Sequence, residues 1–435
     1  MMVWLLFGSF LLLCVLRVPI AFAMFISSTL AIAAQGDVPL SIVPQRVWVG
    51  LNSFPLLAVP FFLFVGQAMN ESGTSLRLIH FSRALVGWLR GGLAHVNVAV
   101  SMIFAGISGV SSAETLGIGS VMIPAMKRER YPAGFTVALN AASSTLGNII
   151  PPSLMMIIYA ATAGLSVGAM FLSGIIPGIL IGVGQMLYSW RVAARLDIGE
   201  RTPFTRKALL ATTRSAWPAL LIPALIIGGI LAGLFTATEA SVAAMLYVLL
   251  LTILYRQFGF SRMFRLTDDS IGLFSLSLLC VAAASLWAWL LAFYAVPQGI
   301  VDWMSEAGLL GSPGRVFIAV IFIFLVVGTF MDAVPAIIIL QPIIGQITGA
   351  VGIDPYHMGI VVVLTLAIGL ITPPYGLCLL IASDLGKITV AAGTRALVPF
   401  YLISLAVVAV AVFFPDLILW IPRHALATFG PGTPP

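Results

Sequence analysis

Twelve apolar segments, joined by short polar connections, take up most of the 435-residue sequence. A transmembrane helix needs about 20 consecutive apolar residues, and most of the segments approach or exceed that length. Charged residues make up only 8% of the chain, against roughly 25% in a typical soluble domain. The pattern predicts an all-α polytopic membrane protein and excludes a soluble one. The segments are 2–16, 19–34, 47–70, 93–126, 134–163, 167–190, 215–235, 239–255, 270–295, 313–350, 358–384 and 396–414.

Two of these segments, 93–126 and 313–350, are too long for a single crossing and are interrupted near their centres. Small and polar residues fill the interruptions at 106–114 and 328–335. Each half then has about 14 to 16 residues, which is short for a full span. We therefore expect two re-entrant helical hairpins, the first opening to the cytoplasm and the second to the outside, together with about ten crossing helices.

The distribution of basic residues supports this topology. With ten crossings, all but three of the 21 Lys and Arg residues fall on one side of the membrane, the exceptions being Arg46, Arg315 and Arg423. Membrane proteins retain Lys and Arg on the cytoplasmic side, so both termini are expected outside. The net charge of +6 then reflects orientation, and no nucleic-acid partner is needed to explain it.

An internal repeat relates the two halves of the chain. Residues 146–160 align without gaps on 368–382, at a constant offset that pairs Gly147 with Gly369 and the two Pro-Pro sequences with each other. Each copy follows one hairpin, and five crossings per half invert the second half. This arrangement is typical of secondary transporters. We expect inverted repeats at 1–190 and 215–414, a cytoplasmic linker at 191–214 that forms an amphipathic surface helix, and an outer tail at 415–435.

The repeated Gly-x-x-x-Pro-Pro sequence predicts two cation sites. Proline removes a helix hydrogen bond, so the helices 134–163 and 358–384 should unwind locally and free carbonyl groups opposite the hairpin tips. Carbonyl and hydroxyl oxygens suit a hard cation such as Na⁺, although the Pro-Pro pairs could also serve only to kink two packed helices. The first site would use Ser108, Gly109, Ser112, Gly147, Ile150 and Pro152, and the second Gly328, Asp332, Gly369, Thr372 and Tyr375.

Several other polar residues lie at the same membrane depth. Ser111, Asn148 and Asp332 are candidate substrate contacts, and Asp332 is a candidate for the ion as well, because an acid inside a membrane is costly and usually functional. Asn148 could also simply pack helices. Glu114 and Glu239 each begin a helix, where a carboxylate complements the helix dipole. We expect both to cap their helices.

Two other functions, intramembrane proteolysis and ATP-driven transport, have little support in the sequence. The sequence Gly-Ile-Ser-Gly at 106–109 matches the Gly-x-Ser-Gly of rhomboid intramembrane proteases, but none of the four histidines occupies the middle of a predicted span, so Ser108 lacks a base. The chain also has no Walker A motif for ATP. We therefore expect a transporter and not an enzyme.

Short motifs follow one another along nearly the whole sequence. They are 60–66 (PFFLFVG), 104–109 (FAGISG), 146–153 (LGNIIPPS), 174–178 (GIIPG), 233–240 (GLFTATEA), 330–332 (FMD) and 369–374 (GLITPP). In these motifs the chain resembles the large membrane subunit of tripartite ATP-independent periplasmic (TRAP) transporters. Residues 110–114 depart from the pattern of that family, in which Ser-Ala precedes small residues.

This resemblance implies a function that topology alone does not. Such subunits lie in the bacterial inner membrane and import organic acids by an elevator mechanism driven by a Na⁺ gradient. A periplasmic binding protein delivers the substrate, and a small four-helix membrane subunit, expected here as a separate chain, supports the scaffold. The alternative within transport is a symporter of divalent anions and Na⁺ that needs no binding protein.

Overall fold

The computed structural model describes residues 2–199, 202–254 and 260–429, which form helices joined by short connections. No strand occurs in these ranges. The first half contains α1 (Met2–Val15), α2 (Ile20–Gln35), α3 (Ile42–Leu51), η1 (Phe54–Leu57), α4 (Ala58–Glu71), α5 (Thr74–Val86), α6 (Gly92–Ser108), α7 (Ser111–Arg128), α8 (Ala133–Ser144), η2 (Thr145–Asn148), α9 (Leu154–Ala163) and α10 (Val167–Leu196). The second contains α11 (Arg206–Leu231), α12 (Ala237–Leu254), α13 (Phe260–Phe293), α14 (Val296–Glu306), η3 (Leu309–Gly311), α15 (Pro313–Phe330), α16 (Ala333–Val351), α17 (Pro355–Gly369), α18 (Leu377–Gly386), α19 (Val390–Phe413), α20 (Pro415–Ile418) and α21 (Trp420–Phe429).

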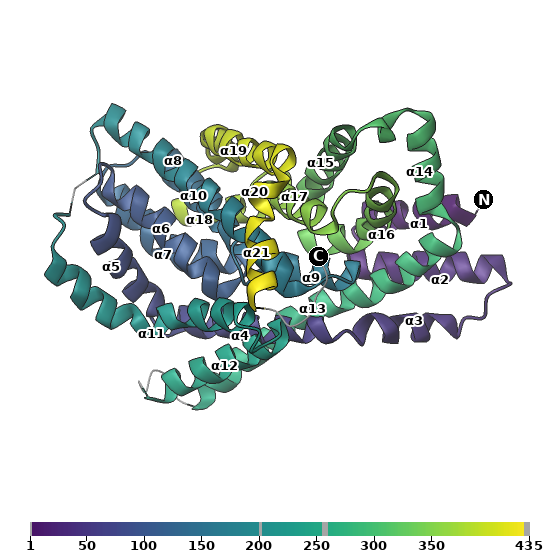
Figure 1. Cartoon of the computed structure of the whole chain (residues 1–435), viewed down its shortest axis with the longest axis horizontal. Helices are drawn as coiled ribbons and strands as arrows, with labels where there is room; N and C mark the ends of the chain where they lie inside the picture. Colours follow the sequence, from purple (N-terminus) through teal and green to yellow (C-terminus); the bar gives the residue numbers. More distant parts are fainter. Residues whose placement is uncertain (1, 200–201, 255–259, 430–435) are drawn as a thin grey trace.

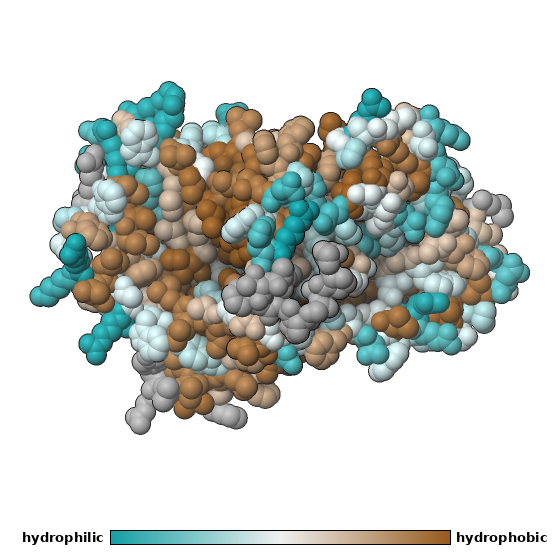
Figure 2. Space-filling view, viewed as in Figure 1, coloured by the Kyte–Doolittle hydropathy of each residue, from teal (hydrophilic) through white to brown (hydrophobic). Residues whose placement is uncertain are grey.

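The helices build an elongated molecule (Figure 1). Apolar side chains cover much of the centre of the visible face, and hydrophilic side chains gather toward both ends of the long axis (Figure 2). Seven helical segments in the described ranges are long and apolar enough to cross a membrane. The chain is therefore an all-α polytopic membrane protein, as the sequence predicts.

Both predicted hairpins are present. The helices α6 and α7 pack against each other and meet at a two-residue tip, Gly109 and Val110, while α15 and α16 meet at Met331 and Asp332. Each predicted unwound helix is also broken: η2 and an irregular segment separate α8 from α9, and residues 370–376 separate α17 from α18. Both Pro-Pro bonds in these breaks are cis.

Several predicted boundaries are wrong. The segment 47–70 is not one helix, because α3 ends at Leu51 and α4 begins only at Ala58. The linker 191–214 is not a separate surface helix: its first residues extend α10 and its last begin α11, so the connection is only 197–205, of which 200–201 lie outside the described residues. The hairpin arms α15 and α16, at 18 and 19 residues, are longer than expected. Apolar content alone locates buried segments but not the residues at which helices end.

Two amphipathic helices were not predicted as elements. In α5 and α14 the apolar positions alternate with polar ones, so neither forms a long apolar run. Two of the basic residues used to assign the topology, Arg201 and Arg256, lie outside the described residues, as does 430–435 of the tail. The expected cap at Glu239 is confirmed: its carboxylate accepts from the Thr236 backbone N–H at 2.8 Å, and the Thr236 hydroxyl accepts from the Glu239 N–H.

Packing divides the helices into two groups. The hairpins and broken helices pack on each other, with α7 and α8 against α18, α15 against α17, and α10 and α19 alongside. A second group contains α1 to α5 and α11 to α13, in which α13 packs against α2, α3 and α4, and α11 against α5 and α12. The two groups meet where α4 and α5 pack against α6 and where α13 packs against α16, so the hairpins and broken helices lie on one side of a shared boundary and α4 and α13 on the other.

Candidate functional site between the two hairpin tips

The first hairpin tip lies against the break between α8 and α9. The Leu154 backbone N–H donates to the Gly109 carbonyl at 3.2 Å. Gly109 has φ +65°, and a Cβ atom there would lie 2.5 Å from the Pro152 carbonyl oxygen. Glycine is therefore required both by the left-handed backbone and by the close approach. Two residues of the predicted first cation site are thus in direct contact.

The other residues of this predicted site surround the contact. A Cβ atom on Gly147 would lie 3.3 Å from the Ser111 backbone nitrogen, so η2 reaches the start of α7. The Ser108 hydroxyl is buried and has no hydrogen-bond partner, while Ser112 faces a cavity. The Ile150 side chain packs against Gly178 of α10, so Ile150 can contribute only its backbone carbonyl. An orphaned hydroxyl among freed carbonyl groups fits a hard cation.

The second hairpin tip lies in the same way against the break between α17 and α18. The Tyr375 backbone N–H donates to the Thr329 carbonyl at 2.9 Å. Gly328 and Gly369 cross so closely that a Cβ atom on Gly369 would lie 2.7 Å from the Gly328 carbonyl oxygen. The Thr372 hydroxyl donates to the Ile368 carbonyl at 2.7 Å, and the Tyr401 hydroxyl lies within hydrogen-bonding reach of it. Four of the five residues predicted for the second site are therefore held at one crossing.

The fifth, Asp332, occupies the tip of the second hairpin. It is the N-cap of α16 and accepts from the Ala333 backbone N–H at 2.8 Å. Asp332 is partly buried and lines the cavity between the tips. The acid is thus placed where it can face a cation at the second tip, a substrate in the cavity, or both.

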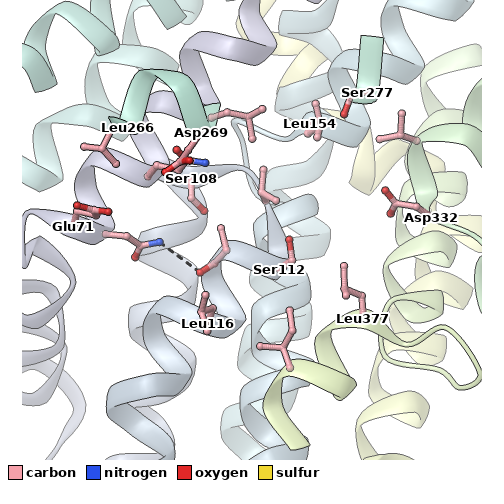
Figure 3. A pocket seen from close by; sticks show the side chains of 18 residues that line it. Glu71, Ser108, Ser112, Leu116, Leu154, Leu266, Asp269, Ser277, Asp332 and Leu377 are labelled. Carbon is pink, nitrogen blue, oxygen red and sulfur yellow. Dashed lines mark hydrogen bonds between the residues drawn. The ribbon is translucent and has the colours of Figure 1, made fainter. Parts of the chain in front are cut away.

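A cavity of about 590 Å³ connects the two tips. Ser108, Val110 and Ser112 reach it from the first hairpin and Asp332 and Val334 from the second, with α9 and α18 adding apolar side chains. Figure 3 shows Asp332 across the cavity from Glu71 and Asp269. The opposite wall comes from α4 and α13: Leu63, Gly66, Gln67, Asn70, Glu71, Leu266, Asp269 and Ser277. A cavity of this size fits a small organic ligand.

The charges around the cavity are all acidic. Glu71, Asp269 and Asp332 line it, and none of the described lining residues is Lys, Arg or His. Glu71 is paired with Arg262 of α13 at 2.6 Å, on the exposed side. An anionic ligand would find no fixed positive side chain among these residues. No histidine is among the described residues that line the cavity. The structure therefore adds no support for Ser108 as the nucleophile of a protease.

Two residues expected to contact substrate do not line this cavity. Ser111 and Asn148 are both buried in the packed core behind the first tip. The Asn148 carbonyl accepts from the Ser153 hydroxyl, which is also the N-cap of α9. The helical spacing explains the difference: Ser112 faces the cavity, whereas Ser111, one residue earlier, points about 100° away around α7.

Comparison with known proteins decides which family this architecture belongs to. The sequence matches the family model of the tripartite ATP-independent periplasmic transporter, DctM component, over residues 7–417. The chain belongs to this family. Among TRAP relatives, the 2,3-diketo-L-gulonate TRAP transporter large permease protein YiaN of Escherichia coli is 33% identical, over 92% of this chain and 94% of its own. The uncharacterized protein YgiK of Salmonella typhimurium is 38% identical, over 96% of each chain.

A solved structure shares the fold of this TRAP component. The YdaH transporter of Alcanivorax borkumensis superposes with a TM-score of 0.55 and covers 83% of this chain and 85% of its own. The identity is only 15%, so the likeness concerns the fold alone.

The cavity wall formed by α4 and α13 was not predicted from the sequence of this TRAP component. A signal was present in α4, where Gln67 and Asn70 interrupt an apolar helix three residues apart and so share one face. The Asn70 side-chain amide lies 3.5 Å from the Ala113 carbonyl of α7. In α13, Asp269 precedes the predicted span, and nothing local indicates that it reaches the cavity.

Proposed function

We propose that this chain is the permease of a Na⁺-coupled secondary transporter that imports an organic acid. A periplasmic binding protein would deliver the acid, and a small four-helix subunit on a separate chain would complete the complex in the bacterial inner membrane, with both termini in the periplasm. Membership of a tripartite, periplasmic family supports the two partners. A relative named for 2,3-diketo-L-gulonate, itself an organic acid, supports the substrate class.

The observation that carries the Na⁺ coupling is the mismatch between an acidic cavity and an anionic substrate. The described lining holds three carboxylates and no basic side chain. A carboxylate substrate needs a nearby positive charge, and bound cations are often the largest local charges in such a site. Cations held at the two tips would lie at both ends of the cavity. Substrate and Na⁺ would therefore bind together, which is the requirement for symport.

The position of the cavity supports an elevator movement. Its walls come from two groups of helices, the hairpins with the broken helices on one side and α4 with α13 on the other. Because both tips belong to the same packed group, they can move as one unit past α4 and α13. Such a movement would carry substrate and cations across the membrane without taking either tip apart.

Uptake in proteoliposomes tests this proposal. The complex would be reconstituted with its small subunit and given binding protein preloaded with labelled acids, including a C4-dicarboxylate, a sugar acid and an aromatic acid. We expect uptake of at least one acid only with an inward Na⁺ gradient. Equal uptake with choline in place of Na⁺ would contradict the coupling, and equal uptake without binding protein would favour the independent symporter.

Removing one hydroxyl from each tip should weaken the response to Na⁺. Ser108→Ala and Thr372→Val keep the side-chain volumes close to the original, so folding should be unaffected. We expect each to raise the Na⁺ concentration for half-maximal uptake by roughly tenfold, because one ligand of a hard-cation site is lost. Thr394→Val, which removes a hydroxyl from α19 outside the site, is the control. Unchanged Na⁺ dependence in both site variants would rule out the proposed ligands.

A further inference from the structure

Glu114 has a buried carboxylate whose two oxygens accept no hydrogen bond in the structure. It lies in the first turn of α7, just behind the first hairpin tip, and is 0% exposed. Neither carboxylate oxygen has a hydrogen-bond partner, and none of the ion pairs among the described residues includes it. The expected capping role is wrong: the N-cap of α7 is Val110, without a side-chain hydrogen bond. This contrasts with Glu239, which does cap its helix.

The groups around Glu114 are oxygen donors that are themselves incompletely satisfied. Ser111, one helical turn earlier on α7, has a buried hydroxyl with no partner. The Ser101 hydroxyl of α6 lies within hydrogen-bonding reach of the carboxylate, but it donates its one proton to the Ser143 hydroxyl at 3.0 Å. Gly147 leaves room at this point, because a Cβ atom there would lie 2.7 Å from Glu114 Oε2.

This arrangement is costly unless something neutralises it. A carboxylate in a low-dielectric interior loses its hydration and must be paired or lose its charge. The N-terminal dipole of α7 supplies only about half of one positive charge, spread over several N–H groups. A monovalent cation bound by the carboxylate and two hydroxyls would balance the charge and use the orphaned oxygens. Oxygen donors of this kind select hard cations.

We propose that Glu114, Ser111 and Ser101 form an additional Na⁺ site, separate from the two sites at the hairpin tips. It lies on the buried side of the first tip, where the Glu114 carboxylate adjoins Gly147 of the first tip site, and away from the substrate cavity that Ser112 lines. The tip sites use neutral ligands and Asp332, whereas this one is built on a fixed, fully buried negative charge. The inference rests on the proposed Na⁺ coupling and adds one cation to it.

Direct binding of ²²Na⁺ to the purified complex tests the site without a substrate. The number of bound ions would be measured by scintillation proximity for the wild type and for Glu114→Gln, which removes the charge and keeps the shape. We expect Glu114→Gln to bind one Na⁺ fewer, and Glu114→Asp to keep the number with roughly tenfold weaker affinity. Glu239→Gln, another carboxylate in the first turn of a helix, should bind as the wild type does.

Thermal unfolding in detergent distinguishes the loss of a Na⁺ site from a variant that does not fold. Glu114→Gln should be at least as stable as the wild type in Na⁺-free buffer, because a buried charge is gone, and should gain less stability when Na⁺ is added. Combined with Ser108→Ala, it should still bind one ion fewer, and a remaining ion should bind roughly tenfold more weakly. A Ser108→Ala change that has no further effect in the Glu114→Gln protein would overturn a separate site. An unchanged number of ions in Glu114→Gln would overturn the role of Glu114. A wild type that binds no Na⁺ would instead overturn the proposed function.

Discussion

Gly369→Ala is expected to reduce uptake to background and to lower the thermal stability of the protein. A Cβ atom at this position would lie 2.7 Å from the carbonyl oxygen of Gly328, 2.8 Å from its carbonyl carbon and 2.9 Å from its Cα. All three are backbone atoms, which cannot rotate away. Forcing α15 and α17 apart should cost about 1–3 kcal/mol, as overpacking does in other cores. It would also separate the second tip from Thr372 and Tyr375.

The other glycine of the same crossing supplies the control. A Cβ atom on Gly328 would meet the Leu366 side chain at 3.3 Å and the Gly369 Cα at 3.4 Å, distances that a small adjustment can relieve. We therefore expect Gly328→Ala to retain most of the uptake and stability. Uptake in proteoliposomes and unfolding temperature in detergent check both variants. Equal behaviour of the two would contradict a crossing in which Gly369 is the tighter partner.

Gly109→Ala should abolish Na⁺-dependent uptake through two separate effects. The φ angle of +65° is unfavourable for any L-residue with a Cβ atom, at about 1–2 kcal/mol. The added methyl group would also lie 2.5 Å from the Pro152 carbonyl oxygen and push the first tip away from the break. The proposed first cation site should then lose its arrangement of freed carbonyl groups, and Na⁺ should raise the unfolding temperature of this variant less than that of the wild type.

Gly352→Ala separates the two effects. Gly352 ends α16 with φ +71°, and a Cβ atom there would have no neighbour within 4 Å. This variant carries the backbone cost without the collision, so we expect a modest loss of stability and nearly normal uptake. A Gly109→Ala protein that behaved like Gly352→Ala would show that the contact between the tip and Pro152 does not matter for Na⁺ coupling.

The broken elements could be predicted because their causes are local. A Pro-Pro pair interrupts a helix wherever it occurs, and small residues in the middle of an overlong apolar segment allow the chain to turn back. The helix ends between Leu51 and Ala58 and at the linker could not be predicted, because apolar content does not report helix ends. The helices α5 and α14 could not be predicted either, because their buried faces depend on the neighbours against which they pack.

The residues of the candidate site likewise fall into those that the sequence predicts and those that depend on tertiary packing. The residues at the tips and breaks, such as Gly109 with Pro152 and Gly328 with Gly369, were predicted together and lie in contact. The wall formed by α4 and α13 was not predicted, because Asp269 and Ser277 reach the cavity only through long-range packing. Glu114 was predicted as a cap, since its position in the sequence cannot tell whether a partner lies within reach.

The sequence alone determined the class of the protein, its two hairpins, its two broken helices and its TRAP resemblance. The class, the hairpins and the broken helices follow from hydrophobicity, charge placement and proline geometry, which act over a few residues and need no partner. The resemblance follows from short motifs along the chain. Tertiary structure alone decided which oxygens face the cavity, which carboxylate is left buried without a partner, and which helices close the site. Those properties depend on distances between segments that are far apart in the chain, and only packing sets such distances.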